Sequence, residues 1–248
     1  MAFTRLSVNV NAIAQLRNRR NLPWPSVTGL SAIALEAGAY GITVHPRPDE
    51  RHIRRTDVYE IDAMLRRDWP GKEYNIEGYP TDDFLALCES VRPDQVTLVP
   101  DLPGQNTSDH GWDTVAHKDF LTDVVARIHG FGARVSIFVD ADPKLVDAAK
   151  STGAERIEIY TGPYGGSFEQ TVRQMRLEEV VATAKAAFAA GIDVNIGHDL
   201  TLKNLPPLLY RVPQVAEASI GHAVIADALL YGLGETVRKY RTACGETL

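Results

Sequence analysis

Four titratable side chains stand at or near the ends of short apolar segments. His45 follows GITV, His198 follows VNIG and His222 follows ASIG, while Glu77 is the fourth residue of YNIEG. A single histidine in such a place is more often hydrogen-bonded to a neighbouring loop than used in chemistry. Three histidines and a glutamate in one cleft are what proton transfer near neutral pH requires, so the set indicates acid–base catalysis or ligand binding.

Residues that bind phosphate accompany this set. Gly197 and Gly221 precede two of the histidines, and glycine lets backbone N–H groups and a helix N-terminus approach an anion. Arg47 ends the segment GITVHPR, and arginine binds phosphate in a bidentate manner. The arginines of the segment LRNRR, which are Arg17, Arg19 and Arg20, offer a second anion site together with Arg47, Arg51 and His52. The sequence therefore predicts phosphorylated substrates.

The elements that must position these groups alternate between strands and helices. Segments with apolar residues three or four apart, several ending at glycine in AGA, FGA, TGA or AGI, predict helices. Eight candidate strands separate them: LSVNV from Leu6, GITV from Gly41, YNIEG from Tyr74, QVTLVP from Gln95, RVSIFVDAD from Arg134, RIEIYTG from Arg156, DVNIGHD from Asp193 and EASIGHA from Glu217.

Eight alternations in about 250 residues predict a single domain, residues 1–248, folded as a (β/α)8 TIM barrel with extra helices. One extra short helix is expected between residues 11 and 27. Active sites of such barrels lie at the carboxyl ends of the strands, where the titratable side chains stand. An open doubly wound sheet is the alternative, but it would carry a glycine-rich loop where this chain reads VNVNAIAQ.

Composition restricts the class of protein. The formal net charge of −6 gives no reason to expect nucleic acid or a membrane as a partner. Cys88 and Cys244 are far apart and form no CxxC motif. The first residues lack the apolar core of a signal peptide, so we expect a cytoplasmic protein. No HxH or HExxH spacing is present, and we expect neither a metal nor a cofactor.

Several blocks of the chain, in order, resemble the pyridoxine 5′-phosphate synthase family of vitamin B6 biosynthesis. They are VNVNAIAQLRNRR, GITVHPRPDERHI, NIEG, LVPD, VSIFVDAD, IEIYTG, VNIGHDLT and SIGHAVIADAL. The resemblance implies a barrel assembled as a homo-octamer, a tetramer of dimers. It also implies condensation of 1-deoxy-D-xylulose 5-phosphate with 3-amino-2-oxopropyl phosphate to pyridoxine 5′-phosphate, phosphate and water, without metal or organic cofactor.

Matching motifs imply roles for individual residues. His45 and Glu77 correspond to the family's proton acceptors, and His198 corresponds to its proton donor. The other matches bind substrate: Asn9, Arg20, Gly221 and His222 the aminoketone phosphate, and Arg47, His52 and Thr107 the deoxyxylulose phosphate. Without the resemblance, His52 would be taken for a loop or surface residue. The loop DLPGQNTSDHGWD, which contains Thr107, is long enough to close as a lid.

Three residues depart from the family pattern. Asn11 and Ala12 stand where many members have an aspartate and a histidine that contact the deoxyxylulose substrate, and an amide cannot act as a base. Asp199 replaces a usual glycine, and its carboxylate would repel phosphate unless it turns away to cap the following helix. These departures motivate one alternative, a phosphometabolite sensor without catalysis.

A second alternative is a metal-dependent phosphosugar epimerase or aldolase. In that case the metal would lie among the three strand-end histidines, because imidazole is a common metal ligand. Chelator-sensitive turnover of one sugar phosphate would favour this hypothesis over the synthase.

Overall fold

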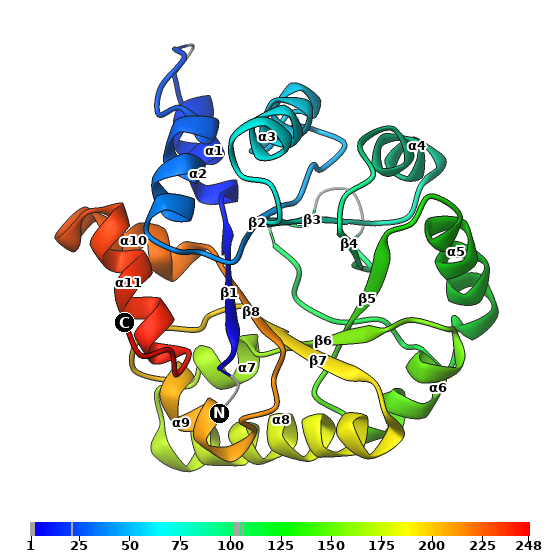
Figure 1. Cartoon of the computed structure of the whole chain (residues 1–248). Coiled ribbons are helices and arrows are strands. Elements are labelled where there is room, and N and C mark those ends of the chain that lie inside the picture. Colours follow the sequence, from blue (N-terminus) through cyan, green and yellow to red (C-terminus); the bar gives the residue numbers. More distant parts are fainter. Residues whose placement is uncertain (1–2, 21, 102–104, 106) are drawn as a thin grey trace.

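The computed structural model describes residues 3–20, 22–101, 105 and 107–248. At its centre is a closed barrel of parallel strands, in which each strand pairs with the next and β8 pairs with β1 (Figure 1). The strands are β1 (Arg5–Asn9), β2 (Gly41–Val44), β3 (Glu73–Gly78), β4 (Gln95–Leu98), β5 (Arg134–Val139), β6 (Arg156–Tyr160), β7 (Asp193–Gly197) and β8 (Glu217–Ile220). The eight predicted strands and the predicted barrel are confirmed.

Helices surround the barrel, and the predicted extra helix, α1, follows β1 directly. They are α1 (Asn11–Asn18), α2 (Val27–Glu36), α3 (Arg55–Asp68), α4 (Asp82–Val91), α5 (Lys118–Gly130), the 3₁₀ turn η1 (Pro143–Leu145), α6 (Val146–Ser151), α7 (Gly162–Gly165), α8 (Gln170–Ala190), α9 (Leu205–Arg211), α10 (His222–Tyr231) and α11 (Leu233–Ala243). The apolar pattern from Ala223 to Arg241 predicts one continuous helical segment, but Gly232, with φ 78°, divides it into α10 and α11.

Glycine ends helices where the sequence indicates it. Gly132 follows α5 with φ 88°, and Gly191 follows α8 with φ 70°. This left-handed conformation strains residues that carry a Cβ, and it turns the chain out of the helix. The next strand then begins at the end of the barrel that lies away from the mouth.

The strands alternate between side chains that face the surrounding helices and side chains that face the barrel interior. On β2, Ile42 and Val44 are fully buried in the apolar core. The intervening Thr43 faces inward, where its hydroxyl lies 2.7 Å from that of Ser7 on β1. On β3, the inward residue Asn75 accepts a hydrogen bond of 3.0 Å from Thr97 on β4. The barrel interior is therefore polar and hydrogen-bonded, and the same alternation places the next inward residues at the mouth.

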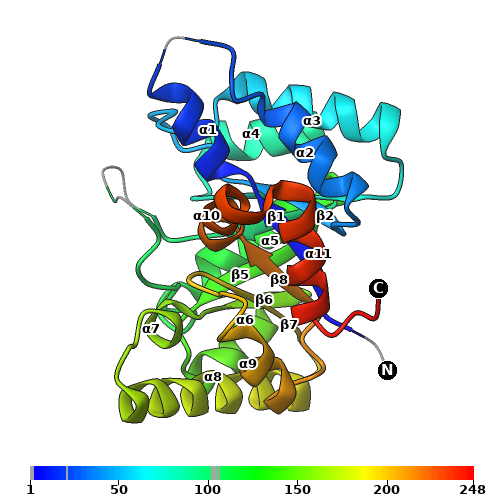
Figure 2. The same ribbon diagram turned by 90° about the vertical axis from the view of Figure 1, so that its left-hand side faces the viewer.

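Helices α1 and α2 lie beside α10 and α11 (Figure 1). The C-terminus lies at the end opposite the mouth (Figure 2), where the Thr4 N–H donates to the Cys244 carbonyl at 3.1 Å. Within the described part of the chain, no helix has the length and apolar character needed to cross a membrane.

Candidate active site

A cavity of about 380 Å³ lies at the carboxyl ends of the strands. Arg17, Arg20 and Gly197 do not line this cavity, but most residues that the sequence assigns to the site do. They are Asn9, Asn11, His45, Arg47, His52, Glu77, Thr107, His198, Asp199, Gly221 and His222. Residues separated by more than 200 positions in the sequence thus meet at one mouth.

In the wall of the cavity, His45 lies between two carboxyl groups. Nδ1 of His45 lies 3.9 Å from Oε2 of Glu77, and its Nε2 lies 3.9 Å from Oδ2 of Asp101. Asn9 donates to the same Glu77 oxygen at 3.4 Å. All three groups of this histidine–carboxyl set are buried, which removes the screening that water would provide.

Burial raises the pKa of the Glu77 carboxyl to about 8, and the Asp101 and Glu217 carboxyl groups add to the shift. Burial also raises the pKa of Glu158 well above its usual value, with the charge of Glu77 as a second cause. Glu158 lines the cavity from β6, and its Oε2 has no hydrogen-bond partner among the described residues. At neutral pH the interior therefore holds carboxylic acids that can donate protons.

The pKa values of two imidazoles in the site are lowered instead of raised. Burial lowers the pKa of His198 to about 4, with Arg47 as the second cause. The pKa of His45 is lowered well below its usual value, first by burial and then by Arg47. The His198 ring packs against Phe138 and Tyr160, with ring centroids 5.0 and 5.3 Å away. Both imidazoles are thus neutral at pH 7 and able to accept protons.

Asp101 is a residue of this site to which the sequence analysis assigned no role. It follows β4, accepts a hydrogen bond from the Arg47 guanidinium and accepts another of 2.6 Å from the Ser108 hydroxyl. A signal was available in the sequence, because Asp101 continues the inward alternation of Gln95 and Thr97. Glu158 offered a similar signal, since it is a carboxylic acid at an inward position of RIEIY.

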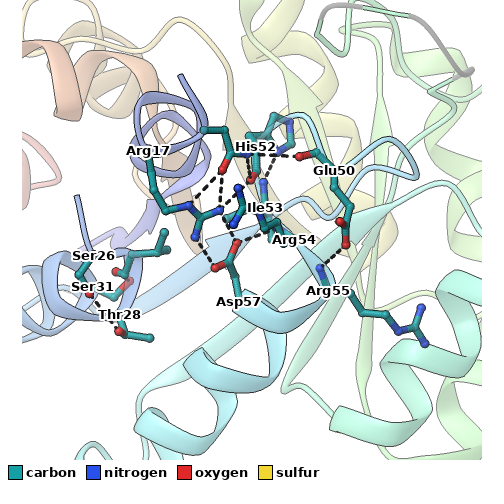
Figure 3. Close-up of polar contacts among 12 residues, drawn as sticks. Arg17, Ser26, Thr28, Ser31, Glu50, His52, Ile53, Arg54, Arg55 and Asp57 are labelled. Atoms are coloured by element: carbon teal, nitrogen blue, oxygen red, sulfur yellow. Dashed lines mark hydrogen bonds and ion pairs between the residues drawn. The ribbon is translucent and has the colours of Figure 1, made fainter. Parts of the chain in front are cut away.

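His52 is buried and lines the cavity, contrary to its surface-like surroundings in the sequence. Its Nδ1 accepts a hydrogen bond of 2.9 Å from the Ile53 N–H, so the neutral ring carries its proton on Nε2. Figure 3 shows what holds this segment: Arg17 donates to the His52 carbonyl at 3.3 Å and to the Asp57 carboxylate at 2.5 and 2.9 Å.

Arg17 is therefore a structural residue, which corrects the hypothesis that it contributes to an anion site. The guanidinium of Arg17 forms a buried ion pair with the Asp57 carboxylate, and both side chains are less than a tenth exposed. Arg20 is exposed at the end of α1 and does not line the cavity. Its assignment to a substrate phosphate stays a prediction.

Gly197-His198 and Gly221-His222 are the same dipeptide in the sequence, but their surroundings in the structure differ. Helix α10 begins at His222, so the Gly221 pair does stand at a helix N-terminus. No helix begins directly after Gly197, since the next one, α9, begins at Leu205. A Cβ at Gly197 would lie 2.2 Å from Oε1 of Glu158, so this glycine leaves room for a carboxyl group.

Two departures from the family pattern now have structural consequences. Oδ1 of Asn11 accepts a hydrogen bond of 2.9 Å from the backbone N–H of His45, so the amide holds the histidine segment. Asp199 is exposed with φ 55°, and it caps no helix, because α9 begins only at Leu205. Asp199 lines the cavity, so the condition under which its carboxylate would avoid the phosphate, a side chain turned away as a helix cap, is not met.

The loop from Asp101 to Asp113 carries Thr107 to the cavity, where this residue is exposed. Residues 102–104 and 106 of the expected lid lie outside the described residues. Across the described ranges, no three histidine, cysteine, aspartate or glutamate side chains come together as a potential metal site.

Known sequences match this chain over nearly its whole length. The family described as "Pyridoxal phosphate biosynthesis protein PdxJ" matches residues 6–246. The pyridoxine 5′-phosphate synthase of Allorhizobium ampelinum is 58% identical over 247 residues, which cover 98% of each chain. That of Mesorhizobium japonicum is 58% identical over 242 residues, which cover 97% of this chain and 98% of the relative.

Similarity to solved structures extends to other barrels. The YdjI aldolase of Escherichia coli superimposes with a TM-score of 0.63 at 12% identity, covering 98% of this chain and 89% of that one. At this level of identity the likeness shows a shared fold and carries no information on the reaction.

Proposed function

The chain belongs to the pyridoxine 5′-phosphate synthase family, and we propose that His45, Glu77 and His198 perform its proton transfers at the mouth of the barrel. The protein is thus an enzyme of vitamin B6 biosynthesis that forms the pyridine ring. It condenses 1-deoxy-D-xylulose 5-phosphate with 3-amino-2-oxopropyl phosphate. The observation that carries the assignment of roles is the buried His45 imidazole between the Glu77 and Asp101 carboxyl groups.

The chemistry consists of amine addition to a ketone, loss of phosphate, ring closure and dehydration. Each step moves a proton, and the site offers both kinds of group. Neutral His45 accepts a proton from the substrate, and Glu77 becomes an acceptor once it has lost its own proton. His198 donates after substrate phosphates enter, because their negative charge offsets Arg47 and raises the pKa of the imidazole.

Two phosphate sites follow from the arrangement at the mouth. The N-terminus of α10, at Gly221 and His222, holds the aminoketone phosphate, because its free N–H groups and dipole favour an anion. Arg47 and the Nε2–H of His52 hold the deoxyxylulose phosphate, with Thr107 beside them. Two separated anion sites suit two phosphorylated substrates.

The test is an endpoint assay with both substrates, with each substrate alone, and with and without a chelator. We expect pyridoxine 5′-phosphate, identified by mass, only when both substrates are present, and in equal amount with chelator. Chelator-sensitive turnover of one sugar phosphate supplied alone would favour the metal-dependent epimerase or aldolase. Binding of both phosphates without any product would favour the sensor.

We propose that the enzyme assembles as a homo-octamer, a tetramer of dimers, as the resemblance implies. Large apolar side chains are exposed on the neighbouring α1–α2 and α10 surface, among them Leu16 (58%), Trp24 (62%), Leu229 (83%) and Leu230 (75%). Such a surface is typical of an interface between subunits. Light scattering is expected to give eight chain masses, and Leu229→Glu is expected to give a smaller species. A monomeric wild type would contradict this assembly.

We propose that the enzyme acts in the cytoplasm. Cys88 and Cys244 are both free and buried, which suits the reducing cytoplasm.

A further inference from the structure

We propose that Asp101 is a positioning residue that exchanges partners when substrate binds, an inference that rests on the proposed function. Before binding, its carboxylate holds the guanidinium of Arg47. When a substrate phosphate binds the guanidinium, the ion pair between Arg47 and Asp101 breaks. The Asp101 carboxylate then accepts a hydrogen bond from Nε2 of His45 and supports this imidazole as a proton acceptor.

The contacts of Asp101 suit such an exchange. Its Oδ2 accepts from Arg47 and from Ser108 and lies 3.9 Å from Nε2 of His45, just beyond hydrogen-bond distance. Its Oδ1 is buried and has no hydrogen-bond partner in the part of the chain that the structure describes. A buried carboxylate with an unused acceptor oxygen beside an imidazole can accept a hydrogen bond from one more donor.

The guanidinium of Arg47 also has space in which to move. A second cavity of about 240 Å³ adjoins the first, and Asp101 lines only this second one. His45 and Arg47 line both cavities and thus form the wall between them. The remaining described contact of the guanidinium is a hydrogen bond of 3.2 Å to the Gln105 carbonyl, so a phosphate in the larger cavity competes with two acceptors.

The exchange would change the charges that act on His45. The charged and titratable groups around this imidazole are Glu77, Asp101, Arg47, Arg51, His52 and His198. After burial, Arg47 is the largest cause of the low pKa of His45. A phosphate neutralises this guanidinium, and a hydrogen bond from the imidazole to a carboxylate favours its protonated form. The base therefore strengthens only when a phosphorylated substrate is in place.

The first test titrates the histidine rings by NMR, with and without 1-deoxy-D-xylulose 5-phosphate as the only substrate. The His45 signals are assigned by their loss in His45→Gln. In the wild type we expect the substrate to raise the pKa of His45 by about one unit, a tenfold change in proton affinity. The phosphate still neutralises Arg47 in Asp101→Asn, so there the rise should become clearly smaller, and an equal rise would contradict the exchange. The full rise should persist in the control Asp49→Asn, whose carboxylate pairs with Arg51 instead. An unchanged pKa in the wild type would overturn the proposal, whether or not the variants fold.

The second test separates positioning from a structural role by kinetics. Asp101→Asn is expected to bind 1-deoxy-D-xylulose 5-phosphate about tenfold more tightly, because the competing carboxylate is gone, while kcat falls about tenfold. Asp101→Glu should recover most of kcat. Weaker binding together with lower kcat in Asp101→Asn would indicate a structural role and contradict the exchange. If the proposed function itself failed, the wild type would form no product, but the NMR titration would still report on the exchange.

Discussion

Replacing Glu77 with glutamine is expected to lower kcat by about a thousandfold, within the range that a positioned general acid–base group contributes. Glutamine keeps the shape of the side chain and can still accept the hydrogen bond that Asn9 donates at 3.4 Å. It cannot exchange a proton at neutral pH. Because the change affects the transition state rather than ground-state contacts, the dissociation constants of both substrates should stay within about threefold.

The pH profile gives this prediction a second measurement. The pKa of Glu77 lies near 8, above its usual value, so the proton-accepting carboxylate forms only as the pH rises through that range. For the wild type at saturating substrates, kcat is therefore expected to rise with pH up to about 8, because His198 holds its proton in the substrate complex. The residual activity of Glu77→Gln should lack this rise.

A matched control is Glu60→Gln, which makes the same chemical change on the exposed face of α3 and should leave both kcat and the profile unaltered. Wild-type turnover in Glu77→Gln would remove Glu77 from the mechanism. If the activity of Glu77→Gln still rises with pH as in the wild type, another group is responsible for this titration.

Replacing His198 with asparagine is expected to lower kcat by about a hundredfold or more, with little change in KM, because the proton donor is lost while the phosphate sites remain. Asparagine is the suitable replacement, since His198 has φ 76° and asparagine tolerates the left-handed conformation better than most residues. Part of the packing against Phe138 and Tyr160 is also lost, so thermal unfolding should be measured in parallel.

The control for this variant is His129→Asn. His129 is exposed on α5 and pairs with Glu155 at 2.9 Å, so its replacement should leave turnover unchanged. If His198→Asn folds like the wild type and raises KM while kcat stays the same, His198 binds substrate and does not donate the proton.

The sequence by itself determined the barrel and the central residues of its mouth. Strand formation and the direction of each side chain are local properties, because successive residues of a strand face opposite sides. A segment such as YNIEG therefore fixes both a strand and the inward position of Glu77 near its end. The same reasoning applies to GITVH and His45. Closure of the barrel, predicted from the eight alternations, then brings these positions together.

Only the tertiary structure decided which neighbouring groups act on those residues. Arg17 and Arg20 are equivalent in LRNRR, yet Asp57, 40 positions away from Arg17, makes one of them structural. Gly197 and Gly221 precede histidines in the same way, but Glu158 occupies the space beside the first. Such pairings depend on contacts between distant segments, as do the burial and charges that set each pKa. These contacts exist only after the chain has folded, so no local pattern in the sequence encodes them.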